Sequence, residues 1–131
     1  TVVTAELREK LLQQPWPEIQ YRPQRDAYIA ELSRIYGPVA EGCVALQDKV
    51  GLYQKDMLSI YQAKEQEIRS VLAEMPAAGE IRKMLEAVGL EMGAFENMYS
   101  PEKIRDAIAY AKELKDRYTV LWMYYDLFGG Q

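Results

Sequence analysis

The sequence predicts an all-α fold, a compact bundle of five to seven helices that ends in a long C-terminal helix. Two observations lead to this prediction. Apolar residues recur three and four positions apart through most of the chain. No stretch of useful length alternates between apolar and polar residues, and neither Asn-Gly nor Asp-Gly occurs to mark a hairpin. We therefore expect residues 1–131 to form a single all-helical domain.

The N-terminal part predicts two helices separated by a proline-rich connection. The first is expected from about Thr4 to Gln13, and Pro15-Trp16-Pro17 ends it. The second is expected from Gln24 to Tyr36. Gly37-Pro38 stops this helix, because glycine suits the left-handed position after a helix and proline cannot continue it.

After Pro38 the helical spacing runs from Val39 to Ile60 and passes through Gly42 and Gly51 without a change of phase. Either one long helix contains both glycines or two helices meet near Gly51. Because an interior glycine costs about 1 kcal/mol relative to alanine, we favour the break. A further helix is expected from Asp56 to Met75, where Pro76 stops it.

The last third predicts a helix over Gly79–Val88, a short turn or helix around Ala94–Tyr99, and a final helix from Ser100 through Phe128. Ser100 is a favourable N-cap, and Pro101 is tolerated at the first helical position. Apolar residues at helical spacing define one expected buried stripe on the final helix: Ile104, Ala107, Ile108, Ala111, Leu114, Tyr118, Leu121 and Tyr125.

Composition narrows the possible functions. Hydrophobic residues make up 49% and charged residues 27% of the 131 residues, a balance typical of a globular domain. The net charge of -4 gives no support to nucleic-acid binding. The lone Cys43 excludes an internal disulfide, is expected in the core, and fits a reducing, cytoplasmic location. We expect no signal peptide, and the apolar run from Tyr118 to Tyr125 is far shorter than the roughly 20 residues of a membrane span.

No residue set indicates catalysis, cofactor binding or metal binding. The chain has no histidine, which excludes imidazole bases and ordinary zinc sites. Gly89-Leu90-Glu91-Met92-Gly93 lacks the preceding strand and following Lys-Ser or Lys-Thr of a phosphate loop. We therefore assign no catalytic, cofactor-binding or metal-binding residue.

Two features of the C-terminal part leave alternatives open. Lys112, Lys115 and Arg117, with Arg105 earlier, could meet a phosphate, but Asp106, Glu113 and Asp116 are interleaved and favour a solvated face. Glu113 and Arg117 are also spaced as a surface ion pair. The Tyr118–Phe128 end is apolar on all sides, which indicates either a central core helix or an interface with another domain or subunit.

The sequence of the predicted final helix, KIRDAIAYAKELKDRYTVLWMYYDLF, resembles the C-terminal end of sn-glycerol-1-phosphate dehydrogenases. In those enzymes a KDRYT-type stretch precedes an apolar end that contains Asp-Leu. Those enzymes belong to the iron-dependent alcohol dehydrogenase and dehydroquinate synthase superfamily. The resemblance covers about Glu80 to Phe128 and includes no catalytic motif.

The resemblance implies the distal part of a C-terminal helical domain that follows a nucleotide-binding α/β domain. The whole enzyme would use NAD(P) and a divalent metal (Zn, Fe or Ni) to interconvert dihydroxyacetone phosphate and sn-glycerol 1-phosphate. This chain would complete the core and the cleft wall, with the nucleotide-binding domain as its partner and homo-oligomer contacts possible. By itself it would be inactive and would bind neither nucleic acid nor membrane. The alternative is a stand-alone all-α interaction module that uses the apolar Tyr118–Phe128 end.

Overall fold

Helices make up all the regular structure in the part of the chain that the structure describes. The computed structural model describes residues 1–129, with the side chains of residues 95 and 96 left out, and no strand occurs in that part of the chain. The all-α prediction is therefore confirmed. The elements are, in order, α1 (Val2–Gln13), α2 (Arg25–Tyr36), η1 (Gly37–Val39), α3 (Ala40–Val50), α4 (Met57–Ala73), α5 (Ala78–Ala87), α6 (Ala94–Met98), α7 (Pro101–Tyr110), η2 (Ala111–Leu114) and α8 (Val120–Phe128), where η denotes a 3₁₀ helix.

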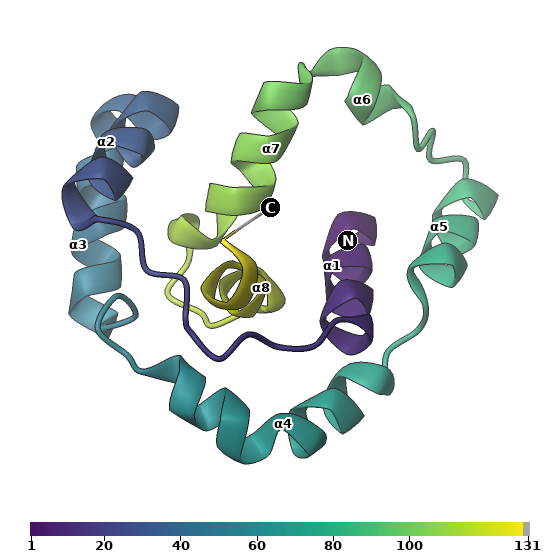
Figure 1. Ribbon diagram of the computed structural model, residues 1–131. Coiled ribbons are helices and arrows are strands. Elements are labelled where there is room, and N and C mark those ends of the chain that lie inside the picture. The colour runs from purple at the N-terminus through teal and green to yellow at the C-terminus, as the bar shows by residue number, and fades with distance from the viewer. Residues whose placement is uncertain (130–131) are drawn as a thin grey trace.

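The helices surround α8, which lies in the middle of the molecule (Figure 1). In this view α2 and α3 lie side by side on the left, α4 runs along the bottom, α5 stands on the right, and α6 and α7 lie at the top. Helix α1 lies inside this ring and packs against α8, α5 and α4. None of the helices in the described residues combines the length and the apolar character that crossing a membrane requires.

The break between α3 and α4 is confirmed, and glycine is its cause. Helix α3 ends at Val50, and Gly51 adopts a left-handed conformation with φ of 72°. Such a conformation is unfavourable for residues with a side chain, so Gly51 ends the helix as a C-cap. Asp56 then caps α4 by accepting a hydrogen bond from the backbone N–H of Ser59.

The predicted long C-terminal helix is wrong. The chain forms α7, then the single turn η2, then extended backbone at Lys115, and begins α8 only after Thr119. The carbonyl groups at the end of η2 lose their helical partners, and the buried side chain of Gln47 replaces them. Its amide nitrogen donates to the carbonyl oxygens of Glu113 and Lys115, each at 2.9 Å. The carbonyl groups left without partners by the interruption are thus hydrogen-bonded by a side chain of α3, far away in the sequence.

The predicted buried stripe on that helix changes with the break. Ile108 and Leu121 pack against core residues as expected, and Tyr125 is buried. However, Leu114 and Tyr118 are 48% and 40% exposed, whereas Lys112 and Glu113, just before Leu114, are buried. The 3₁₀ turn and the extended segment rotate the stripe away from the core.

The α8 helix is a core element of the chain itself. Its residues Trp122 to Leu127 are all buried. Of the two alternatives for the apolar C-terminal end, the structure shows the central core helix. The surface that the interaction-module hypothesis requires is therefore covered by the chain's own helices.

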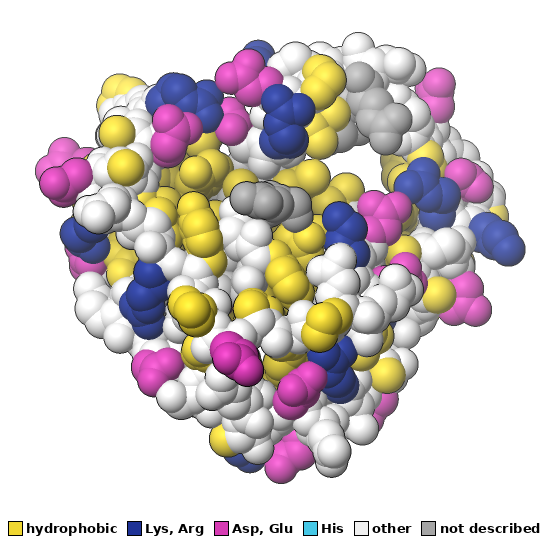
Figure 2. Space-filling model, viewed as in Figure 1, with side chains coloured by type: hydrophobic (Ala, Val, Ile, Leu, Met, Phe, Trp, Pro, Cys, Tyr) yellow, Lys and Arg dark blue, Asp and Glu magenta, His cyan; other side chains and the backbone are white. Residues whose placement is uncertain are grey.

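The connection between α1 and α2 passes below α8 and then up its left side in this view (Figure 1). The backbone N–H of Tyr21 donates to the carbonyl oxygen of Asp126 at 2.6 Å, and the Tyr21 ring meets the Tyr125 ring edge-on at 5.4 Å. Gly129 lies under the same ring, and a Cβ atom there would be 3.1 Å from Tyr21 Cδ2. Tyr21 therefore holds the connection against α8, whereas Ile19 is 81% exposed. Hydrophobic side chains show through the middle of this face (Figure 2).

Candidate functional site

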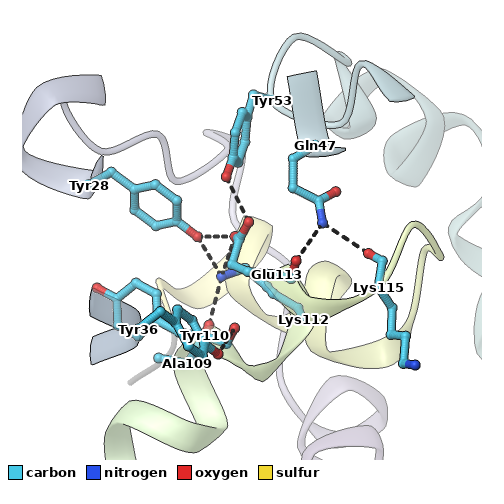
Figure 3. A network of polar contacts seen from close by, with 9 residues as sticks. All are labelled: Tyr28, Tyr36, Gln47, Tyr53, Ala109, Tyr110, Lys112, Glu113 and Lys115. Carbon is cyan, nitrogen blue, oxygen red and sulfur yellow. Dashed lines mark hydrogen bonds and ion pairs between the residues drawn. The ribbon is translucent and has the colours of Figure 1, made fainter. Parts of the chain in front are cut away.

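Two oppositely charged side chains lie in the interior where α2, α3, η2 and α8 meet. Lys112 and Glu113 are both in η2, and their residues are 2% and 0% exposed (Figure 3). Burying an isolated charge is very unfavourable, so each must find compensating partners. We call Lys112, Glu113 and the residues that bond to their side chains the polar centre.

The Glu113 carboxylate accepts hydrogen bonds from two tyrosines on other elements. Tyr28 of α2 donates to Oε1, and Tyr53, in the loop after α3, donates to Oε2 at 2.7 Å (Figure 3). The Lys112 ammonium lies 3.3 Å from Oε1. Both oxygens of the buried carboxylate are therefore bonded, which is the condition for burying it without a large loss of stability.

The Lys112 ammonium has a partner for each of its three protons. It donates to the Tyr28 hydroxyl and to the Ala109 carbonyl oxygen, each at 2.7 Å, and it pairs with Glu113. It also lies 3.6 Å from the centre of the Tyr125 ring and 5.0 Å from that of Trp122. Aromatic faces attract a cation, and this attraction is stronger where water is excluded.

Burial shifts the titration of these groups. It lowers the pKa of the Lys112 ammonium to about 8, and the charge of Glu113 opposes that shift. Burial, followed by the negative charge and hydrogen bond of Glu113, raises the pKa of both the Tyr28 and the Tyr53 phenols. The two tyrosines therefore remain neutral donors across the ordinary pH range.

A second buried carboxyl group lies on α8. Asp126 Oδ2 accepts hydrogen bonds from the hydroxyls of Tyr61 at 2.8 Å and Tyr118 at 3.0 Å. Burial raises the pKa of the Asp126 carboxyl, while the hydrogen bond from Tyr118 opposes the rise. Asp126 thus ties α4 and the segment after η2 to α8.

A cavity of about 270 Å³ adjoins the polar centre. It opens between the connection that precedes α2, the loop after α3 and one side of α8. Aromatic and charged side chains both line it, among them Tyr28, Tyr53, Trp122 and Tyr125 and the three charged residues Arg22, Arg25 and Asp126. Lys112 and Glu113 are not among its lining residues. The buried pair therefore supports the wall and does not face the space.

The basic residues considered for phosphate binding do not form a site. Lys112 is buried against Glu113, while Arg105, Lys115 and Arg117 are exposed. The expected surface pair of Glu113 with Arg117 is wrong, because Glu113 points inward to Tyr28 and Tyr53. Cys43 is buried, as predicted, and burial raises the pKa of its thiol.

The chemistry that this arrangement offers is binding and orientation. Within the described residues, no group of three or more His, Cys, Asp or Glu side chains is placed to hold a metal ion. Sequence reasoning missed Glu113, Tyr28, Tyr53 and Gln47 as a set. Tyr28, Gln47 and Tyr53 each lie 60 or more residues before Glu113, so no local pattern connects them to it.

Comparisons with known proteins found no match: no family model, no curated protein and no solved structure was significantly similar to the chain.

Proposed function

We propose that this chain is the distal part of the C-terminal helical domain of an NAD(P)- and metal-dependent dehydrogenase of the glycerol-1-phosphate type. In that enzyme it completes the helical core and the wall of the catalytic cleft, and supplies no catalytic group. Its partner is the nucleotide-binding domain of the same polypeptide, and the location is cytoplasmic.

One observation supports this proposal above the others. The segment that carries the resemblance includes the buried polar residues of the core, although residues 115–119 within it are exposed. Lys112 and Glu113, shortly before the KDRYT stretch, belong to the polar centre, and Tyr118 of that stretch donates to Asp126 of the Asp-Leu end. A sequence likeness confined to surface positions would carry much less weight, because surface positions tolerate substitution.

The metal and the nicotinamide do not fit the residues present. The chain has no histidine, and the described part offers no metal-binding cluster. In the proposed enzyme both groups are held by segments outside this chain, and no step of the reaction is assigned to residues described above.

Blotting of source cells with an antibody raised against these residues tests the proposal. We expect a band much heavier than 15.1 kDa, the mass of this chain. The corresponding purified polypeptide should oxidise NADH or NADPH when dihydroxyacetone phosphate is added, and a metal chelator should abolish this activity. Pre-immune serum is the control for the blot.

Either of two results would overturn the proposal. A band at the mass of this chain alone would exclude a larger enzyme. A heavier polypeptide that fails to reduce dihydroxyacetone phosphate in the presence of Zn, Fe or Ni would exclude the proposed dehydrogenase activity.

A further inference from the structure

Helices α5 and α6, with the loops beside them, form an arc on one side of the molecule. Figure 1 shows this arc running from the end of α4 to the start of α7, on the side away from α2 and α3. We call the arc, residues 77–99, the strap. Figure 2 shows an opening through the molecule between the strap and the other helices. Among the described helices, α5 packs extensively against α1 alone.

The strap buries little apolar surface. Ala78 is the one residue of α5 that is buried. Four large apolar side chains of the strap are more than half exposed: Met84, Val88, Leu90 and Met98. Burial of apolar surface is the main favourable term in packing, and segments with few buried apolar contacts open at the lowest free energy. We therefore expect the strap to dock weakly.

Two polar contacts join α5 to α1. The backbone N–H of Ala78 donates to the Glu9 carboxylate at 2.7 Å. Four residues further along α5, the Arg82 guanidinium forms an ion pair with Glu6 at 3.1 Å. The ion pair is exposed, so it adds little to stability. The bond to Glu9 is charge-assisted and is the stronger of the two.

A third contact, at the base of the strap, involves a buried cation. Arg8 of α1 is 6% exposed, and its Nη2 atom donates to the carbonyl oxygen of Pro76 at 2.6 Å. Its Nε and Nη1 atoms are buried and make no hydrogen bond within the described residues. A Glu9 carboxylate oxygen lies 3.9 Å from Nη2, beyond hydrogen-bond distance. Burying such a guanidinium is unfavourable, because two of its nitrogens lose water without gaining other partners.

Opening of the strap should relieve this unfavourable burial. The guanidinium bonds to Pro76, immediately before the strap, so movement of the strap away from α1 should admit water to it. The hydrated donors then regain hydrogen bonds, which offsets part of the contact that α5 loses. The polar centre gains nothing similar on opening, because Lys112 and Glu113 are already paired. Weak docking and the gain in solvation of Arg8 thus act in the same direction.

We propose that the strap is a hinged flap that opens from α1 while the other helices stay folded, and that the buried Arg8 keeps its docking weak. Opening widens the passage seen in Figure 2 and uncovers the side of α1 against which α5 packs. This inference goes beyond the proposed dehydrogenase function and does not depend on it, because it concerns only contacts within this chain.

Hydrogen exchange of the backbone amides, followed by NMR on the whole chain at increasing denaturant, provides the test. After correction for intrinsic rates, we expect the hydrogen-bonded amides of α5 to exchange at least about a hundredfold faster than those of α8. The opening free energy of α5 should depend little on denaturant, because strap opening exposes little surface. That of α8 should fall steeply, since those amides exchange only when the whole chain unfolds.

Two substitutions should shift the exchange of α5 in opposite directions. Arg8→Met keeps a long side chain and removes the unpaired charge, while Glu9 keeps its bond to the α5 backbone and is 33% exposed. We expect exchange about tenfold slower than in the native chain. Glu9→Gln weakens the charge-assisted bond and should make exchange about fivefold faster. Glu41→Gln, at an exposed position of α3, is the matched control and should leave it unchanged.

The proposal is overturned if the amides of α5 and α8 show the same opening free energy and the same denaturant dependence, because the strap would then open only with the whole molecule. It is equally overturned if Arg8→Met folds but exchanges at the native rate or faster in α5, since the bond to Pro76 would then outweigh the buried charge. If Arg8→Met does not fold, Glu9→Gln decides, and equal rates in Glu9→Gln and Glu41→Gln would reject the flap.

Discussion

The two sides of α8 are packed by different kinds of interaction. Towards α1 and α4, Met123, Tyr124 and Leu127 join an apolar cluster with Leu7, Leu11 and Tyr61. Towards α2 and η2, Tyr125 packs beside Tyr28 and covers the Lys112 ammonium. Apolar contact is not directional, whereas the polar side works only when donors and acceptors are aligned. The polar side therefore fixes which segments meet more strictly than the apolar side does.

Removing one charge from the polar side should give the largest effect. Lys112→Met leaves the Glu113 carboxylate buried without its cation, and breaking a buried pair in this way costs about 3–5 kcal/mol. Denaturant unfolding measures the loss. Lys115→Met, at an exposed neighbouring position, is the control and should change stability by no more than about 0.5 kcal/mol.

The double variant Lys112→Met with Glu113→Gln sharpens this result. Because it removes both charges, it should be more stable than Lys112→Met alone. If the single substitution had no larger effect than Lys115→Met, the polar side would not be a coupled network.

Truncation on the apolar side should have a large effect of a different origin. Leu11 is 0% exposed and contacts the cluster around α8. Leu11→Ala should cost about 2–5 kcal/mol, since it removes buried methyl groups and leaves a cavity. Calorimetry or denaturant unfolding measures it, and Leu90→Ala at a position 52% exposed is the control. Equal losses at both positions would contradict the assignment of Leu11 to the core.

Alkaline pH should change the stability contributed by the polar side of α8 and leave that of the apolar side unchanged. The folded-state pKa of Lys112 is about 8, below the unfolded value of about 10.4. Between these values the unfolded chain binds more protons than the folded chain, so this lysine makes stability rise with pH. The tyrosines act in the opposite direction, because their raised pKa values stabilise the fold below about pH 10 and that contribution is lost above it.

Unfolding midpoints of the native chain and of Lys112→Met, measured from pH 7 to about 10, test this expectation. The native chain should gain stability relative to the variant between about pH 8 and 10. Leu11→Ala should keep the pH profile of the native chain. A parallel profile for Lys112→Met would mean that Lys112 titrates as it does in water.

The smallest loss of stability is expected for a substitution at Leu114, which belongs to neither the apolar nor the polar side of α8. The helical spacing predicts it as core, in line with Ile108, but the structure leaves it 48% exposed. Leu114→Ala should therefore change stability by about 0.5 kcal/mol or less, while Ile108→Ala should cost more because that residue packs against the apolar cluster. If Leu114→Ala cost as much stability as Ile108→Ala, Leu114 would be a core residue, as the helical spacing predicts.

The sequence predicted what local chemistry determines. Helical spacing, Gly37-Pro38 and Gly51 identify most helix ends, and the apolar character of residues 120–128 indicates a buried helix. The interruption after Tyr110 was not predicted, although Thr119 is a favoured N-cap residue. Nor could the polar centre be predicted, because Lys112 and Glu113 resemble surface residues until Tyr28, Tyr53 and Gln47 are brought to them.

The position of α8 has a consequence for how the chain is made. Ribosomes release α1 first and α8 after all the other described helices, yet α1 and α4 share their apolar face with α8. That face stays open during translation of everything between them. Chains exposing such surfaces are prone to aggregate.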